Sequence, residues 1–249
     1  MEFSNKRVLI TGSTRGIGRA LAQRFIGAGA KVAINGRDRT TGAKLVTECG
    51  SDAVAASGDF LTVAGCEAVV ASALDGLGGL DVLINNAGVF PIASMADTDE
   101  RVWDETMSAN VKSAFFTSRA ALSALRSAQG VIINHASIAG LIGLANVTAY
   151  CTSKGAVVQL TRSMAMELAP EIRVNCVCPT TVDNDMGWSA FKRADDPQAA
   201  HQAFVANSKL QRMATMDDVI EAFLFLASPR SSFMTGVALP VDGGKSAGV

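Results

Sequence analysis

The chain reads Val8-Leu9-Ile10-Thr11-Gly12-Ser13-Thr14-Arg15-Gly16-Ile17-Gly18 at the junction between an apolar run and a helix-like segment. The aliphatic run at residues 8–10 is typical of a strand buried on both faces of a parallel sheet. Glycines at positions 12, 16 and 18 allow the backbone to approach a pyrophosphate closely, and the first turn of the next helix presents free N–H groups to it. The residues predicted to form this dinucleotide site are Gly12, Ser13, Thr14, Arg15, Gly16, Ile17 and Gly18.

Short β-rich runs alternate with helical segments along the rest of the chain. Strands are expected at residues 7–11, 31–35, 53–57, 81–85, 130–136, 172–178 and 237–241. Helices are expected at 16–27, 40–49, 63–77, 98–128 with a break near Asn110, 149–168 and 217–227. The alternation predicts an α/β fold with a doubly wound, Rossmann-type sheet of about seven parallel strands and helices on both faces. We expect a single domain over residues 1–249, with a polar, irregular, substrate-covering flap at about 186–209.

The composition argues against several classes of protein. The 249 residues carry a net charge of −1 without a basic stripe, so nucleic acid is not an expected partner. There is no signal-peptide pattern, and no apolar run reaches the roughly 18 residues of a membrane span, so we expect a cytoplasmic protein without a membrane partner. The five cysteines include no C-x-x-C pair, which argues against a disulfide framework and a metal site.

The only tyrosine, Tyr150, lies one helical turn before Lys154, and Ser137 precedes both. A phenol ordinarily ionises at about pH 10. A lysine ammonium on the same helix face stabilises the phenolate, and a serine hydroxyl can hold a carbonyl or alcohol oxygen beside the phenol. The three residues therefore indicate proton transfer to or from a substrate oxygen.

These patterns and several others together resemble the short-chain dehydrogenase/reductase family over essentially the whole chain. They are Thr11-Gly12 with Gly16-Ile17-Gly18, Asn85-Asn86-Ala87-Gly88, Asp59 after the third strand, Asn110-Val111, Ser137, Tyr150 with Lys154, and Val241-Asp242-Gly243-Gly244. The resemblance implies an oxidoreductase whose catalytic tetrad is Asn110, Ser137, Tyr150 and Lys154. Beyond the glycine loop, it implies cofactor contacts at Asp59, Phe60, Asn86, Ala87, Gly88, Tyr150, Lys154, Pro179, Val182 and Asn184.

Each member of this tetrad has an implied role. Tyr150 gives its proton to a carbonyl oxygen in reduction, or removes the proton of an alcohol in oxidation. Lys154 lowers the pKa of the phenol and holds the nicotinamide ribose. Ser137 hydrogen-bonds the reacting oxygen, and Asn110 holds a water that links Lys154 to solvent. The nicotinamide carries the hydride.

The end of the second strand indicates which nicotinamide is used. A carboxylate there pairs with the ribose hydroxyls of NAD and repels the phosphate of NADP. Gly36 stands at this place, followed by Arg37, and Arg15 lies in the glycine loop. Two guanidiniums make charge-assisted contacts to a phosphate. We therefore expect NADP(H), and NAD(H) is the alternative because Asp38 comes next in the chain.

One segment departs from the family pattern, which has Pro-Gly followed by a threonine that contacts the nicotinamide carboxamide. Here Thr180 replaces the glycine, and Asn184 takes the place of the threonine. An asparagine can donate and accept hydrogen bonds, so it can preserve the contact. Of the two histidines, His135 is expected to pack in the sheet, whereas His201 lies in the flap.

The sequence does not disclose the substrate. We expect a carbonyl reductase for a ketone or secondary alcohol. The alternatives are a sugar or polyol dehydrogenase, and a 3-oxoacyl-thioester reductase in which Arg126 or Arg173 binds a carrier phosphate. A nucleotide sensor without activity is disfavoured because the tyrosine and lysine are both present. The helices near 114–125 and 156–169 carry apolar side chains on more than one face, which together with the resemblance implies a homotetramer or homodimer.

Overall fold

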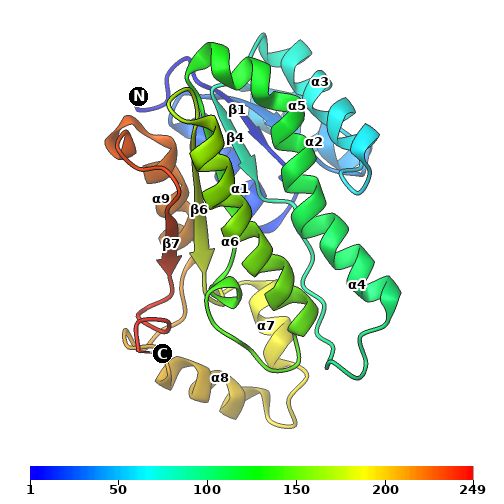
Figure 1. Ribbon diagram of the computed structural model, residues 1–249, viewed down its shortest axis with the longest axis vertical. Coiled ribbons are helices and arrows are strands. Elements are labelled where there is room, and N and C mark those ends of the chain that lie inside the picture. The colour runs from blue at the N-terminus through cyan, green and yellow to red at the C-terminus, as the bar shows by residue number, and fades with distance from the viewer. Residues whose placement is uncertain (249) are drawn as a thin grey trace.

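The computed structural model of the chain describes residues 1–248, except for the side chains of residues 185, 186 and 190. Within these residues, seven strands form one parallel sheet in the order β3-β2-β1-β4-β5-β6-β7, which confirms the predicted doubly wound fold (Figure 1). The strands are β1 (Arg7–Ile10), β2 (Lys31–Ile34), β3 (Ala53–Ala55), β4 (Val82–Asn85), β5 (Val131–His135), β6 (Arg173–Pro179) and β7 (Ala238–Val241). The strand order reverses between β1 and β4, and ligands bind at the carboxyl ends of strands beside such a reversal.

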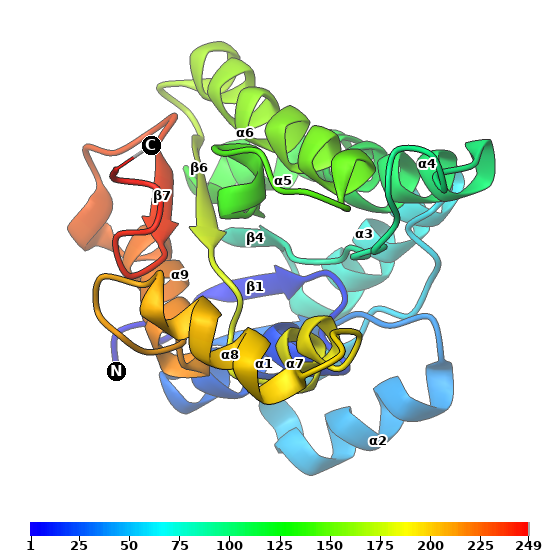
Figure 2. The ribbon, with the colours of Figure 1, turned by 90° about the horizontal axis from the view of Figure 1, so that it is seen from below.

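Helices cover both faces of the sheet, as predicted (Figure 2). One face is covered by α1 (Gly16–Gly27), α2 (Arg39–Cys49) and α9 (Met216–Ala227). The other is covered by α3 (Val63–Leu77), α5 (Ser113–Ala128) and α6 (Thr148–Leu168). No helix within residues 1–248 is both long and apolar enough to cross a membrane.

Strand β1 shows why a continuous aliphatic run is needed in the middle of the sheet. Val8 and Ile10 belong to the core under α1 and α9, whereas Leu9 belongs to the core under α3 and α5. All three side chains are fully buried. Burying an aliphatic side chain stabilises the fold by about 1.5–3 kcal/mol. The strand is thus held from both sides, and the glycine-rich turn that follows it is fixed at the carboxyl edge.

The break predicted near Asn110 is a π-helix. The segment consists of α4 (Glu100–Met107), a π-helical stretch (Ser108–Lys112) and α5. A π-turn holds more residues than an α-turn and often occurs at functional sites. It places the buried Asn110 side chain beside the loop that follows β4.

The flap was expected to be irregular, and this part of the prediction is wrong. It forms two helices, α7 (Asp185–Phe191) and α8 (Pro197–Ala206). The start of α8 has a local cause. The Asp196 carboxylate accepts hydrogen bonds from the backbone N–H groups of residues 198 and 199, and Pro197 stands in the first turn, where no N–H is needed.

Aromatic contacts then join the two helices of the flap. Trp188 stacks on His201 with 4.7 Å between ring centroids, and the Phe191 ring lies 5.4 Å from that of Phe204. Aromatic pairs of this kind stabilise by about 0.5–1.5 kcal/mol beyond the area that they bury. This packing depends on residues in both helices, so the sequence did not show it.

Candidate active site

The glycine loop lies at the carboxyl end of β1 and leads directly into α1. Gly12 and Gly16 have φ angles of 63° and 54°, in a backbone region that residues other than glycine rarely adopt. A Cβ atom at Gly18 would collide with the carbonyl oxygen of Gly12. The first turn of α1 has neither a side-chain cap nor an acidic residue, so its N–H groups are available to an anion.

Asn86 fixes this loop from the neighbouring strand β4. Its Nδ2 donates to the carbonyl oxygens of Thr11 and Gly12 at 3.0 and 3.1 Å. In return, the Thr11 hydroxyl accepts from the backbone N–H groups of Asn86 and Ala87, both at 3.0 Å. Gly88 follows, close enough to Asn110 that a Cβ atom would lie 2.8 Å from its Oδ1. The predicted Asn86-Ala87-Gly88 contacts therefore lie directly against the glycine loop.

Tyr150 and Lys154 lie on α6, and Ser137 follows β5. Burial raises the pKa of Tyr150 to about 12, and the Ser137 hydroxyl beside the phenol acts in the opposite direction. Burial also lowers the pKa of Lys154 to about 8. The Lys154 Nζ donates to the backbone carbonyl of His135 at 2.6 Å and lies 5.7 Å from the centroid of the Tyr150 ring. The three predicted side chains thus converge at the carboxyl edge of the sheet.

Asn110 reaches the same place from the π-helix. Its Oδ1 accepts from the backbone N–H of Val89 at 2.8 Å, and its Nδ2 donates to the Val89 carbonyl and to Ser153 Oγ at 3.1 and 2.9 Å. The amide is therefore satisfied by protein groups that hold the loop after β4 against α6. A water that serves Lys154 would have to use the backbone of the π-helix rather than this amide.

The end of β2 carries the features that were predicted for the adenosine ribose. A Cβ atom at Gly36 would collide with the Thr14 side chain, so the backbone must approach the glycine loop closely there. The guanidiniums of Arg15 and Arg37 are exposed, and neither forms an ion pair within residues 1–248. Between α1 and α2 lies a cavity of about 260 Å³ lined by Thr14, Arg19, Thr40, Thr41, Lys44, Leu45 and Glu48.

Asp38, which made NAD(H) an alternative, is used as the N-cap of α2. Its carboxylate accepts from the backbone N–H groups of Thr40 and Thr41 at 3.0 and 3.1 Å, and from the Thr41 hydroxyl. The Thr41 hydroxyl and the two N–H groups lower the pKa of this carboxyl group. The side chain is thus directed into its own helix terminus.

The other predicted contacts follow β3 and β6. Asp59 accepts from the backbone N–H of Leu61, and the Phe60 carbonyl accepts from Cys66 Sγ. The backbone carbonyl of Pro179 accepts a hydrogen bond from the Ser137 hydroxyl at 3.4 Å. Val182 pairs with Ala214 in an isolated parallel bridge at the base of the flap.

Asn184 and Thr180, the two departures from the family pattern, differ in their surroundings. Asn184 Oδ1 caps α7 by accepting from the Gly187 N–H at 2.9 Å, and its Nδ2 lies 3.5 Å from Met216 Sδ. The Thr180 hydroxyl is buried and forms no hydrogen bond within residues 1–248. A buried hydroxyl without a partner is unfavourable unless a ligand supplies one. With the open N-terminus of α1, this orphaned group shows that the residues present fit a bound dinucleotide.

Two further side chains near the site were not identified from the sequence. Phe90 packs edge-on against the Tyr150 ring at 4.7 Å between centroids, and its position after β4 was the only available signal. His135 was expected to pack in the sheet, but it also hydrogen-bonds Asn86 through Nδ1. No cluster of three or more His, Cys, Asp or Glu residues in the described part of the chain could hold a metal ion.

Known proteins resemble the chain over almost its full length. A family model described as enoyl-(acyl carrier protein) reductase matches residues 12–246. An inactive 2-(S)-hydroxypropyl-CoM dehydrogenase of Xanthobacter autotrophicus is 40% identical over 230 residues, which are 91% of this chain and 100% of the relative. The L-xylulose reductase of Bos taurus is 38% identical over 248 residues, with 98% of each chain covered.

A solved structure agrees with these sequence matches. The Brucella melitensis protein described as a short-chain dehydrogenase/reductase, glucose/ribitol dehydrogenase, superposes with a TM-score of 0.88 at 29% identity and covers 98% of each chain. The chain therefore belongs to the short-chain dehydrogenase/reductase family. It is an oxidoreductase of the class that acts on alcohol or carbonyl groups with a nicotinamide cofactor.

Proposed function

We propose that this member of the short-chain dehydrogenase/reductase family is an NADP(H)-dependent carbonyl reductase that interconverts a ketone and a secondary alcohol. The convergence of Ser137, Tyr150 and Lys154 beside the glycine loop carries this proposal. The bound nicotinamide supplies the hydride. Tyr150 supplies the proton to the carbonyl oxygen, Ser137 holds that oxygen, and Lys154 holds the ribose of the cofactor.

The state of the phenol fits proton donation to a carbonyl oxygen. Because burial raises the pKa of Tyr150 to about 12, the phenol is protonated at neutral pH and ready to donate. Oxidation of an alcohol requires the phenolate instead. The Lys154 ammonium lies 5.7 Å from the centroid of the phenol ring, and it is held by a main-chain carbonyl rather than by the phenol.

The end of β2 supports NADP(H). Gly36 leaves no carboxylate at the ribose position, and Asp38 is bound to the N-terminus of α2. Arg15 and Arg37 are exposed and lie in the loops on either side of the place for the 2′-phosphate. Two unpaired guanidiniums attract a phosphate dianion more strongly than a neutral ribose hydroxyl.

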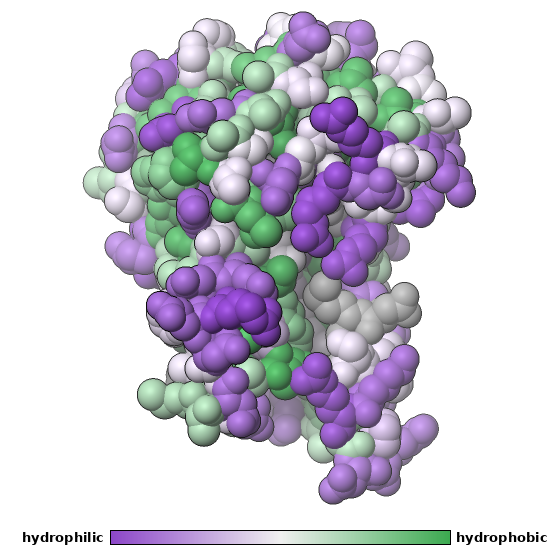
Figure 3. Space-filling model, turned by 90° about the vertical axis from the view of Figure 1, so that its right-hand side faces the viewer, coloured by the Kyte–Doolittle hydropathy of each residue, from purple (hydrophilic) through white to green (hydrophobic). Residues whose placement is uncertain are grey.

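The flap helices α7 and α8 supply the cover of the substrate site in this proposal. Val182 and Ala214, which flank the flap, pair with each other, and Arg193 of the flap donates to the Ile92 carbonyl at 3.1 Å. The flap thus reaches across to the loop after β4 that also carries Phe90. Figure 3 shows apolar surface, in green, in the hollow of the lower half of the molecule, where the flap lies. An apolar cover favours ketones with hydrocarbon substituents.

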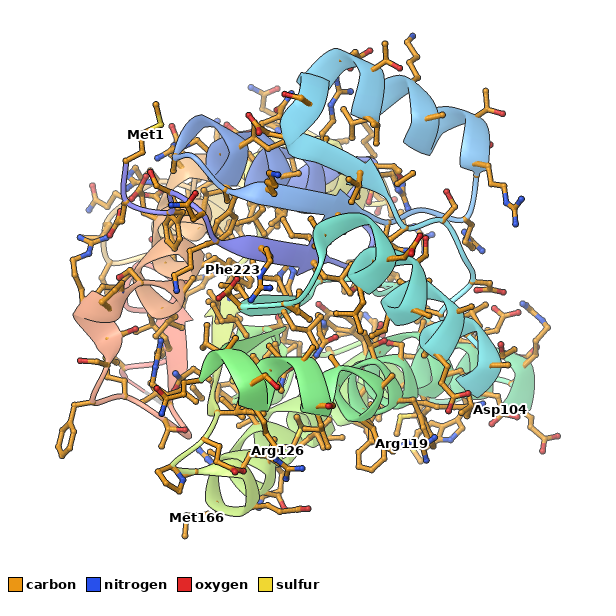
Figure 4. The ribbon with its side chains drawn as sticks, turned by 90° about the horizontal axis from the view of Figure 1, so that it is seen from above. Met1, Asp104, Arg119, Arg126, Met166 and Phe223 are labelled. Carbon is orange, nitrogen blue, oxygen red and sulfur yellow. The ribbon has the colours of Figure 1, made fainter. Side chains whose placement is uncertain are left out.

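The two arginines on which the 3-oxoacyl-thioester reductase alternative depended lie far from the predicted substrate site. Arg126 pairs with Glu171 at the amino-terminal edge of the sheet, which faces the viewer in Figure 4. Arg173 starts β6 at the same edge and donates to the carbonyls of Leu226, Ser231 and Met234. Both lie at the opposite edge from Tyr150. The sugar alternative retains support from the relative described as L-xylulose reductase.

We also propose that the protein is a homotetramer or homodimer. An apolar cavity of about 310 Å³ opens between the π-helix and α6, and it is lined by Met107, Ser108, Val111, Lys112, Phe115, Phe116 and Leu160. Phe115 in this lining is 44% exposed, and a contiguous exposed apolar patch marks an interaction surface. Light scattering at micromolar concentration tests this point, and a monomer would contradict it.

The proposed activity is tested by NADPH consumption with purified protein, with NADH measured in parallel. The panel contains aryl and cyclic ketones, keto-sugars and an acetoacetyl thioester. We expect turnover with NADPH and ketones, and an oxidation rate that rises with pH because the phenolate must form. Binding of NADPH without turnover of any carbonyl, together with oxidation of polyols by NADP, would instead select the sugar or polyol dehydrogenase.

A further inference from the structure

His135 contacts both Asn86, which holds the glycine loop, and Lys154. Its Nδ1 lies 2.9 Å from Asn86 Oδ1, and its backbone carbonyl accepts from Lys154 Nζ at 2.6 Å. On the other side, the imidazole packs edge-on against Phe223 of α9, with 5.4 Å between centroids. Phe223, labelled in Figure 4, is fully buried. One residue at the end of β5 thus connects two parts of the site.

The hydrogen bonds of Asn86 determine which nitrogen of His135 carries the proton. The carbonyl oxygens of Thr11 and Gly12 can only accept, so the Asn86 Nδ2 must face them. The Oδ1 of Asn86 then faces His135, and an amide oxygen can only accept as well. His135 Nδ1 is therefore the donor, which fixes the neutral tautomer that is protonated at Nδ1.

Burial keeps this imidazole neutral. It lowers the pKa of His135 to about 3, and the charge of Lys154 lowers it further in the same direction. A protonated imidazole would place a second cation beside the Lys154 ammonium. Neutral His135 donates to Asn86 without adding a second positive charge to the site.

We propose that His135 is a positioning residue for cofactor binding: its Nδ1–H fixes the Asn86 amide, which holds the glycine loop in its binding geometry. Without this donor, Asn86 Oδ1 has no partner, and the amide can rotate away from Thr11 and Gly12. The effect reaches the loop through Asn86, so His135 itself need not touch the cofactor. This role rests on the proposed function, because it concerns the nicotinamide dinucleotide that the loop binds.

The test compares three variants. His135→Leu removes the donor, His135→Asn places an amide N–H near the position of Nδ1, and Phe223→Leu loosens the imidazole packing without removing the hydrogen bond. NADPH affinity is measured by fluorescence titration, and hydrogen exchange of residues 11–18 is measured in the free protein. If His135→Leu does not fold, His135→Ser replaces it, because serine is too short to reach Asn86.

We expect His135→Leu to weaken NADPH binding roughly tenfold and to speed exchange in residues 11–18. His135→Asn should restore both to within about threefold. Phe223→Leu should lower the melting temperature but leave affinity and loop exchange unchanged. His135→Leu behaving like Phe223→Leu in both measurements would overturn the role of His135. If the wild-type protein binds no nicotinamide cofactor, the proposed function fails, and the exchange data still show whether His135 orders the loop.

Discussion

The glycine loop (residues 11–18) and the flap (about residues 186–209) lie at the same edge of the sheet but are held in different ways. The loop is fixed by hydrogen bonds between short motifs, such as those from Asn86 to Thr11 and Gly12. The flap is held mainly by ring contacts such as that of Trp188 with His201, and by a few polar contacts to the body. Hydrogen bonds specify one geometry, whereas apolar contacts tolerate exchange of side chains. We therefore expect the loop and the tetrad to determine the reaction, and the flap to determine the choice of substrate.

The largest expected effect comes from Tyr150→Phe, which removes only the phenol oxygen. Turnover should fall by about 10³-fold or more, since general acid catalysis contributes roughly 10²–10⁴-fold. The NADPH dissociation constant should stay within about twofold, because the loop is untouched. Steady-state rates and a fluorescence titration measure the two quantities. Substantial residual turnover would refute proton transfer by Tyr150.

The second largest expected effect is a change of cofactor preference in Arg37→Asp. The substitution replaces a phosphate-binding guanidinium by a carboxylate that repels the 2′-phosphate and pairs with ribose hydroxyls. We expect the ratio of kcat/KM for NADPH over NADH to fall by about 10–100-fold. Arg39→Asp changes the net charge equally at a nearby position and serves as the control. Equal effects of the two substitutions would show a general field effect rather than a contact of Arg37.

The pH dependence of the free energy of unfolding tests whether the His135 imidazole stays neutral in the folded protein. The pKa of His135 is about 3 in the folded protein because of burial, below its ordinary value of 6.5. As the pH falls below 6.5, His135 takes up a proton in the unfolded chain but stays neutral in the folded protein. Stability should therefore fall by about 1.4 kcal/mol per pH unit as the pH drops from about 6.5 towards 3.

Urea unfolding between pH 6.5 and 5.5 measures this slope above the range in which carboxylates titrate. His135→Leu should flatten it, whereas His201→Asn, which removes the only other histidine, should not flatten it to the same extent. Equal slopes in the wild-type protein and His135→Leu would show that the imidazole is accessible to protons in the folded state.

The smallest expected effect lies in the flap. Arg193→Ala removes the hydrogen bond to the Ile92 carbonyl that joins the flap to the loop after β4. We expect KM for a ketone to rise about two- to threefold and the NADPH dissociation constant to stay the same. Lys192→Ala, an exposed neighbour, is the control. A larger effect on the cofactor than on the ketone would place Arg193 in the cofactor site instead.

Much of the fold and site was predictable from the sequence because the signals are local. The alternation of strands and helices, the glycine spacing and the i,i+4 placement of Tyr150 and Lys154 depend on fixed periodicities of the backbone. Right-handed crossovers predict a doubly wound sheet, and the structure then gives its order as β3-β2-β1-β4-β5-β6-β7. The convergence of Ser137 with Tyr150 follows from parallel strands that end at one edge.

Only the tertiary structure decided how several polar side chains are used. Asp38 and Asn184 could each face a cofactor by sequence, but both accept N–H groups at a helix start. His135 is 49 residues away from Asn86, and no periodicity links the two. The flap helices likewise depend on rings from separate segments. A local pattern fixes which face a side chain occupies, but its partner depends on what the fold brings to that face.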